Sequence, residues 1–365
     1  MNQQQAASGA PGALSPSRWR VTRVDKGAIR AIPDDGIQVA FDGGTAHGMP
    51  DDDAAAPQAA GRTWRTGPEG TLPAVVGEPL APAVGDWLHV ADGVVRIAPR
   101  ISELVRDSAD TTSREQVIAA NVDTVLIAEP LEPLPALGRI ERLLTIAHRC
   151  GARPVVVLTK ADMVADADFW VEQVRAVAPT ARVLALSATT GAGIDHLRTV
   201  LDDASTLVLV GPSGAGKSTL VNTLAGTEVM GTGRVRGDQR GMHTTTHREL
   251  VPLGPGQALI DTPGLRSIGL VATEDAVAST FEDVESIAAG CRFADCVHDR
   301  EPGCAVQAAV ESGELAERRL DSWRSLRREA QRQAMRADAR LGAEQNRQWR
   351  RGSKAARQAR SRARR

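Results

Sequence analysis

The chain has 365 residues, a formal net charge of −1, 42% hydrophobic residues and four cysteines. This length predicts two or three domains with a substantial core. No stretch approaches eighteen consecutive apolar residues, and the N-terminus lacks a basic segment followed by an apolar one. We therefore expect no membrane span and no secretory signal. So few cysteines exclude a disulfide framework and are compatible with a reducing cytoplasm.

The two ends of the chain differ from its middle in composition. Residues 1–16 are rich in Gln, Ala, Ser and Pro, which predicts a disordered tail. Residues Leu315–Arg365 contain 17 basic and 5 acidic side chains. Such a basic end indicates either an anionic partner such as nucleic acid or a solvated, poorly folded terminus.

Short β-branched segments follow the first tail and are separated by Gly and Asp, which predicts strands of a small barrel. They are Trp19–Val24, Gly27–Ala31, Gly36–Phe41, Asp86–Val90 and Gly93–Ile97. The stretch Gly43–Gly70 interrupts them with an Ala/Pro/Gly mixture and is interpreted as a long flexible loop. Small barrels of this kind bind oligonucleotides or serve as structural modules, and the residues favour neither.

The pattern then changes to apolar strands alternating with helices, which predicts a parallel, doubly wound sheet. The expected strands are Val122–Ala128, Pro154–Leu158, Val183–Leu186, Leu207–Val210 and Ala258–Ile260. The expected helices are Arg139–His148, Ala165–Val177 and Ser218–Leu224. Beyond residue 272 the chain is predicted to be helical over Ser279–Ala289, over Ala305–Ser312 and from Leu315 onward.

A glycine-rich loop between an expected strand and an expected helix matches the pattern G-x-x-x-x-G-K-[ST]. Its backbone N–H groups and the start of the helix can cradle phosphate oxygens. Lys217 is expected to reach the β- and γ-phosphates as a catalytic residue, and Ser218 to bind Mg²⁺. The nucleotide-binding loop comprises Gly211, Pro212, Ser213, Gly214, Ala215, Gly216, Lys217, Ser218 and Thr219.

A second phosphate-sensing segment, Asp261-Thr-Pro-Gly264, follows the strand Ala258–Ile260. Asp261 is expected to hold Mg²⁺ through a water molecule, and the N–H of Gly264 to meet the γ-phosphate. Between the two segments, one threonine of a switch loop is expected to complete the Mg²⁺ shell. The candidates are Thr244, Thr245 and Thr246.

Many GTPases place a water-orienting glutamine directly after this glycine, but here Leu265 occupies that position. His243, in the switch loop, is the nearest residue in sequence that can replace it. It either orients the attacking water or only forms hydrogen bonds within its own loop, and both interpretations stay open.

The segment expected to recognise guanine comes before the phosphate loop, which reverses the usual order. The carboxylate of Asp162 can accept two hydrogen bonds from guanine, and the stem of Lys160 can cover the base. Together with a companion loop after the next strand, the base-contacting set is Thr159, Lys160, Ala161, Asp162, Ser187 and Ala188. Motifs in this order predict a circularly permuted GTPase.

Three cysteines and a histidine lie within fourteen residues: Cys291, Cys296, His298 and Cys304. Three thiolates and one imidazole make a complete tetrahedral shell for one structural Zn²⁺ ion. The alternative is that these cysteines simply pack within a helical domain. Cys150 stands apart in an apolar setting and is expected in the core.

Together these residues resemble the RsgA (YjeQ) family of small-ribosomal-subunit-dependent GTPases over roughly residues 17–335. The resemblance rests on the permuted order of the nucleotide motifs and on five segments. These are Gly85-Asp86-Trp87, Arg100–Arg106, Gln116–Asp123, Gly241–Thr246 and Cys291–Cys304.

The resemblance implies an N-terminal OB-fold, a central circularly permuted α/β P-loop GTPase domain and a C-terminal α-helical zinc domain. The expected boundaries are 1–16 for the tail, 17–103 for the OB-fold with its 43–70 insertion, 115–272 for the GTPase, 273–340 for the zinc domain and 341–365 for the basic tail. It also implies a cytoplasmic GTPase, weakly active alone, stimulated by the small ribosomal subunit and acting late in maturation of that subunit.

The implied cofactors are GTP/GDP, Mg²⁺ and one structural Zn²⁺. The implied partners are the small ribosomal subunit and its rRNA, and a monomer is expected. Two other classes remain open from the residues. One is a metabolic P-loop kinase or ATPase, against which Asp162 argues. The other is a non-catalytic, nucleotide-dependent RNA-binding module, which the missing glutamine allows.

Overall fold

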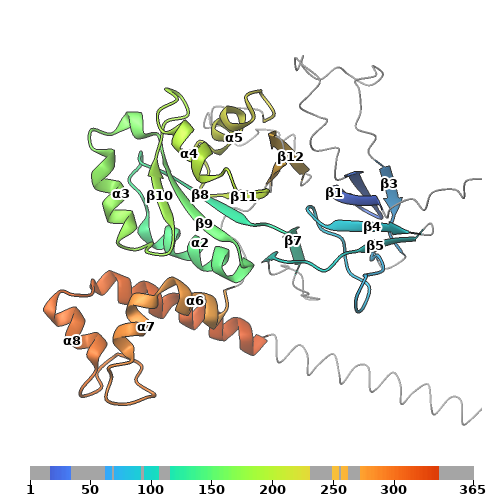
Figure 1. The fold of residues 1–365 in the computed structure, drawn as a ribbon. Helices are drawn as coiled ribbons and strands as arrows, with labels where there is room; N and C mark the ends of the chain where they lie inside the picture. The colour runs from blue at the N-terminus through green and yellow to red at the C-terminus, as the bar shows by residue number, and fades with distance from the viewer. Residues whose placement is uncertain are drawn as a thin grey trace, which may run out of the picture.

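The computed structural model describes residues 17–33, 62–67, 70–91, 94–106, 116–230, 249–254, 256–261 and 272–336 (Figure 1). An eleven-stranded sheet runs through most of this part of the chain in the order β10-β9-β8-β11-β13-β12-β1-β2-β3, with β4 beside β1 and β5 beside β4. Several predictions lie outside the described residues: the two tails at 1–16 and 341–365, the strand Gly36–Phe41, and most of the loop Gly43–Gly70.

The N-terminal strands pair antiparallel and enclose a small core. They are β1 (Ser17–Asp25), β2 (Ala28–Pro33), β3 (Arg62–Arg65), β4 (Trp87–Ala91) and β5 (Val94–Ile97). Four of these confirm predicted strands, because alternate apolar side chains such as Val21, Ile29 and Leu88 face one buried side. The prediction of a loop over all of Gly43–Gly70 is wrong at β3, which pairs with β2.

The central part has the predicted parallel strands, with helices on both faces. The parallel strands are β8 (Thr124–Pro130), β9 (Arg153–Thr159), β10 (Arg182–Ala185), β11 (Thr206–Val210) and β13 (Gln257–Asp261). Helices α2 (Leu137–Cys150) and α3 (Ala167–Arg175) share one buried cluster with the sheet. Helices α4 (Ile194–Val200) and α5 (Lys217–Ala225) share a second cluster.

Strand β12 (Glu249–Gly254) joins the central sheet to the N-terminal strands. It is antiparallel both to β13 and to β1, where Glu249 pairs with Arg23. Strand β12 was not among the strands predicted from the sequence, and its partner β1 lies more than two hundred residues earlier. One sheet therefore extends through both parts of the molecule (Figure 1).

A short hairpin and a tight backbone contact reinforce this junction. Strands β6 (Glu103–Arg106) and β7 (Gln116–Ala120) form a separate antiparallel pair. Gly85 has φ +92°, and a Cβ there would lie 2.2 Å from the carbonyl oxygen of Ala120, so only glycine fits. The amide of Asn121 donates to the Gly85 carbonyl at 3.0 Å and accepts from the N–H of Ile101 at 3.0 Å.

The C-terminal part is helical, as predicted, but with one more break. The prediction of one helix over Ser279–Ala289 is wrong: α6 (Glu274–Thr280) ends before α7 (Glu282–Ala288) begins. Between them Phe281 has φ −114° and ψ 39° and is fully buried, which turns the chain inward. Helix α8 (Ala305–Ser312) confirms its prediction, and a last helix covers residues 317–336.

A buried ionic cluster fastens these helices to α2. The guanidinium of Arg319 donates five hydrogen bonds, two of them to Asp283 and one to Glu141. The other two go to the carbonyls of Val177 and Thr280. All five of its donors are thus used, which is what a buried guanidinium requires. None of the described helices is long and apolar enough to cross a membrane.

Candidate functional site

The predicted nucleotide motifs converge on one edge of the parallel sheet. Strand β9 ends at Thr159, β11 leads into the loop that starts at Gly211, and β13 ends at Asp261. Strands β9 and β8 lie on one side of β11 and β13 lies on the other. From β8 the chain continues outward to β9 and β10, and from β11 it continues in the opposite direction to β13, so the strand order reverses between β8 and β11. Doubly wound sheets bind ligands at such a reversal, beyond the carboxyl ends of the strands.

The glycine-rich loop lies tightly against strand β8. Gly211 has φ +146°, and a Cβ there would lie 2.1 Å from the carbonyl oxygen of Ala128. Gly214 and Gly216 also have positive φ values, of +80° and +78°, but face open space. Gly216 is the N-cap of α5, so the helix begins at Lys217 with its N–H groups directed at the loop.

The side chain of Lys217 folds back over the loop. Its Nζ donates to the carbonyls of Gly211 at 2.9 Å and Pro212 at 2.7 Å. Ser218 follows in the first turn of α5 and is half-buried. An ammonium group held at the mouth of the loop is placed to exchange these carbonyls for phosphate oxygens.

The base-recognition segment is joined directly to the phosphate loop. The hydroxyl of Thr159, which is 3% exposed, donates to the carbonyl of Ala215 at 2.7 Å. Many GTPases have asparagine at this position, and the threonine here supplies a donor that reaches the loop. The contact joins two motifs that are 56 residues apart in the chain.

The rest of the segment forms a tight turn at the end of β9. Lys160 has φ +61°, and its Nζ donates to the carbonyl of Glu132 at 3.1 Å. Asp162 is exposed within the short 3₁₀ helix η1 (Ala161–Met163). The N–H of Ala161 donates to the carbonyl of Leu186 and ties this turn to the neighbouring loop. The carboxylate of Asp162 therefore lies outside the core, where it can accept hydrogen bonds from a guanine base.

The companion loop follows β10, beside the segment just described. Ser187 is buried, and its hydroxyl accepts the N–H of Thr190 at 3.2 Å, which closes a turn that includes the half-buried Ala188. Other predicted residues lie outside the described residues: His243, Thr244, Thr245, Thr246, Gly264 and Leu265.

The four predicted metal ligands also lie together, in the C-terminal helical part of the chain. Their ligand atoms all lie within 4.8 Å of one another. The Nδ1 of His298 is 3.5 Å from the Sγ atoms of both Cys291 and Cys304, which are 3.9 Å apart. A tetrahedral Zn²⁺ with Zn–S bonds of about 2.3 Å requires sulfur atoms about 3.8 Å apart. The donor set and its spacing fit this ion.

Glu301 supports the ligand loop and was missed by the sequence analysis. Its carboxylate accepts N–H bonds from Val297 and Asp299 at 2.9 Å and from Arg300 at 3.1 Å. Hydrogen bonds from backbone N–H groups, that of Val297 first, lower the pKa of this carboxyl from 4.5 to about 2. An acidic residue just before Pro302-Gly303, between two expected ligands, was the available signal.

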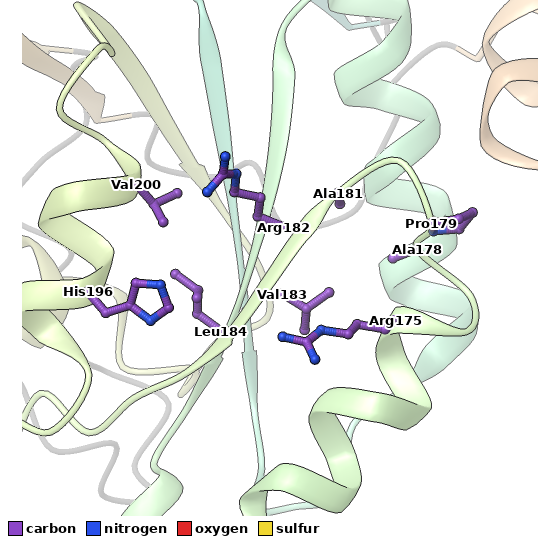
Figure 2. A pocket seen from close by; sticks show the side chains of 9 residues that line it. All are labelled: Arg175, Ala178, Pro179, Ala181, Arg182, Val183, Leu184, His196 and Val200. Atoms are coloured by element: carbon purple, nitrogen blue, oxygen red, sulfur yellow. The ribbon is translucent and has the colours of Figure 1, made fainter.

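An open groove of about 440 Å³ lies elsewhere, at the β10 edge of the sheet (Figure 2). Arg175, Arg182 and His196 extend into it from α3, β10 and α4 (Figure 2). None of the predicted nucleotide or metal residues lines this groove.

The sheet order and motif positions define a P-loop GTPase fold in which the base-recognition strand precedes the phosphate loop, that is, a circularly permuted one. A family model for RsgA GTPase matches residues 97–271. A model for ABC transporters matches residues 194–355, a stretch that includes the loop pattern common to P-loop NTPases.

Curated relatives carry the same family name. A small ribosomal subunit biogenesis GTPase RsgA from Streptomyces avermitilis is 49% identical over 276 residues, which cover 73% of this chain and 74% of that protein. One from Listeria monocytogenes, RsgA 1, is 40% identical over 269 residues, covering 73% and 78%. The chain therefore belongs to the RsgA GTPase family.

Solved structures agree in fold. The crystal structure of YjeQ from Thermotoga maritima has a TM-score of 0.56 at 22% identity and covers 87% of this chain and 99% of its own. That of YloQ, described as a circularly permuted GTPase, has a TM-score of 0.54 at 20% identity, covering 87% and 96%.

Proposed function

We propose that this chain hydrolyses GTP to GDP and phosphate in the cytoplasm, under stimulation by the small ribosomal subunit, during late maturation of that subunit. The observation that carries the proposal is the contact between Thr159 and Ala215, which joins a base-recognition segment to a phosphate loop. The relatives, which are named small ribosomal subunit biogenesis GTPases, support the choice of partner.

Within this proposal, the described residues bind and orient the nucleotide. The loop Gly211–Thr219 surrounds the phosphates with N–H groups, and Lys217 neutralises the β- and γ-phosphates. Asp162 accepts hydrogen bonds from guanine, with Lys160 over the base, and Ser187-Ala188 borders the base from the neighbouring loop. Ser218 and Asp261, the latter through water, would hold Mg²⁺, which supplies charge neutralisation at the phosphates.

The switch residues complete the proposed site. One of Thr244, Thr245 and Thr246 completes the Mg²⁺ shell, and the Gly264 N–H meets the γ-phosphate. Leu265 has no group that can orient water, so His243 is proposed for that role. Its replacement by alanine is expected to lower hydrolysis stimulated by the subunit. Unchanged stimulated hydrolysis in that variant would assign His243 to loop structure alone.

The flanking parts complete the proposal. We assign the five N-terminal strands to an OB-fold, supported by their antiparallel pairing around one small core. The Cys291, Cys296, His298 and Cys304 cluster would hold one structural Zn²⁺ and leave no coordination position for catalysis. Both parts are proposed to contact rRNA, and the chain to act as a monomer.

The decisive experiment measures GTP and ATP hydrolysis by the full chain, with and without purified small ribosomal subunits, over a salt series. We expect slow GTP hydrolysis alone, strong stimulation by subunits, and loss of stimulation as salt weakens phosphate contacts. Equal turnover of ATP would indicate a different P-loop enzyme. Absence of GTP hydrolysis under all conditions would indicate a non-catalytic RNA-binding module.

A further inference from the structure

Four arginines follow one line along the last helix (residues 317–336). They are Arg324, Arg328, Arg332 and Arg336, which we call the arginine ridge. Residues four apart lie on the same side of a helix, about 6 Å from one another along its axis. The ridge thus presents one positive group per turn for three turns.

The opposite side of this helix holds it in place. Trp323, Leu326 and Ala330 are all buried in the core of the C-terminal helices. Three ridge residues, Arg328, Arg332 and Arg336, are exposed. The ridge is therefore fixed in orientation by a packed face and directed at solvent.

Arg324 donates from its Nη groups to Asp321 and to the His298 carbonyl, but the hydrogen bonds of Arg328 and Arg332 leave their charged ends accessible. The Nε of Arg328 donates to the Arg324 carbonyl at 3.2 Å, and the Nε of Arg332 donates to the Arg328 carbonyl at 3.1 Å. Across the described part of the chain, neither residue forms an ion pair with an acidic side chain. In both residues the Nε–H bond fixes the position of the guanidinium group. The two Nη groups remain available to donate hydrogen bonds to a ligand.

Only the first ridge residue is paired on its own helix: Arg324 lies 3.5 Å from Asp321, whereas Arg328 and Arg332 form no ion pair with an acid among the described residues. Residues 324–336 contain five arginines and a single acid, Glu329, whose carboxylate is bound to Arg142 at 2.6 Å. A helix face that is only solvated usually mixes both signs, because like charges four residues apart repel. An uninterrupted positive row instead complements a polyanion.

We infer that the arginine ridge binds the phosphate backbone of RNA. This inference rests on the proposed function, which brings the chain to a ribosomal subunit. The planar guanidinium forks with phosphate oxygens, and a row of them neutralises successive phosphates. A protein partner fits less well, because it would have to present a matching row of carboxylates, and Asp and Glu are depleted at protein interfaces.

The test compares two double variants of the full chain with equal loss of charge. R328Q/R332Q removes two ridge charges, and R175Q/R182Q removes two exposed charges at the β10 groove (Figure 2). Binding to purified small subunits is measured from low to high salt. We expect the slope of log affinity against log salt to fall by about 1.4 to 1.8 for the ridge variant, at about 0.7–0.9 per phosphate contact.

The control variant should keep the wild-type slope, and R328K/R332K should retain most of it because both charges remain. Circular dichroism verifies that the helix persists in each variant. An unchanged slope for R328Q/R332Q would overturn the inference. So would a loss seen on intact subunits but absent on protein-free rRNA, which would assign the ridge to an acidic protein surface.

Because binding is measured without hydrolysis, the two proposals fail separately. If wild-type chain binds subunits through the ridge but hydrolyses no GTP there, the proposed enzyme activity fails and the ridge assignment stands. If GTP hydrolysis is stimulated normally and the ridge variant keeps its salt slope, only the ridge assignment fails.

Discussion

The hydroxyl of Thr159 lies 2.7 Å from the carbonyl oxygen of Ala215, to which it donates a buried hydrogen bond. One end of this bond lies in the base-recognition segment and the other lies in the phosphate loop. Circular permutation has moved the first segment ahead of the second in the chain, yet the contact brings them together. A substitution at Thr159 therefore tests whether the two segments act as one nucleotide site.

Replacing Thr159 by valine keeps the shape of the side chain but removes the donor. The buried Ala215 carbonyl then loses its partner, which we expect to lower the free energy of unfolding by about 1–3 kcal/mol. Nucleotide affinity, followed with a fluorescent guanine nucleotide, should fall with it. T159S keeps the hydroxyl and is the matched control. Equal stability and affinity in T159V and wild type would show that the bond contributes nothing.

Replacing Asp162 by asparagine tests base selection. The exposed carboxylate should accept two hydrogen bonds from guanine, and bonds to a charged group contribute about 1.5–3 kcal/mol. D162N should therefore reduce GTP affinity by about ten- to a hundredfold and narrow the preference over ATP. D168N, on the exposed first turn of α3, is the control. A D162N variant that still prefers GTP by the wild-type ratio would place base recognition elsewhere.

Two glycines of the same loop should respond differently to alanine. At Gly211 a Cβ would lie 2.1 Å from the Ala128 carbonyl oxygen, so the loop must move away from β8. At Gly214 nothing lies within 4 Å, and only the positive φ is strained. We expect G211A to cost about 3 kcal/mol or more in unfolding free energy and G214A about 1 kcal/mol. Comparable losses in denaturant unfolding would contradict this ranking.

Glu301 should control how firmly the thiols and imidazole hold an ion. Glutamine offers its three backbone donors only one accepting oxygen, so E301Q should lose about tenfold or more in zinc affinity, as for other residues that orient ligands. Competition with a chromophoric chelator measures the change, and E311Q, exposed on α8, is the control. Identical affinities would show that the loop holds its shape unaided.

The same carboxylate predicts a pH dependence. Because backbone N–H donors lower the pKa of Glu301 from 4.5 to about 2, the folded state favours its ionised form. Its contribution to stability is complete above pH about 4.5 and is lost as pH falls toward 2. The difference in Tm between wild type and E301Q should therefore be constant near neutrality and shrink below pH about 4.5. A difference that grows on acidification would be inconsistent with this.

The buried pair of Arg319 and Glu141 should matter far more than an exposed one. Their side chains are 2% and 0% exposed and lie 2.8 Å apart. R319M removes the partner that Glu141 and Asp283 share, although Glu141 keeps Arg318 at 3.0 Å, so we expect a cost of about 3 kcal/mol, the lower end for a broken buried pair. Arg175 and Glu172 form a pair that is 53% and 68% exposed, so R175M should change stability by less than about 0.5 kcal/mol. Denaturant unfolding of both variants measures the two losses, and equal losses would contradict the expected difference.

Local patterns predicted much of the fold and the site. The loop after β11 and the strands of the parallel sheet follow from glycine spacing and apolar runs. Phe281, by contrast, breaks a helix that contains neither proline nor glycine. The break depends on burial of the Phe281 ring beneath Arg319, whose guanidinium carbon lies 4.1 Å from the ring centre. Arg319 belongs to the last helix. Periodicity within one segment carries no information about such a partner.

Two further features depend on contacts distant in sequence. Strand β12 exists because β1 and β13 both pair with it, and β1 is at the other end of the described chain. Thr159 departs from the usual asparagine, and only the position of Ala215 shows that a hydroxyl is long enough. Strand β3 was hidden because the surrounding residues are rich in Gly, Ala and Pro, although Thr63 and Trp64 are good strand formers.

The pairing of Glu249 with Arg23 has a mechanical consequence. Strand β12 starts directly after the segment that carries the switch threonines, and it is bonded to β1 on one side and β13 on the other. The N-terminal strands are consequently attached to the central sheet through a backbone bridge at Arg23 and Glu249. A movement of those strands relative to the nucleotide site therefore acts directly on β12, at the residue where the chain leaves the switch segment.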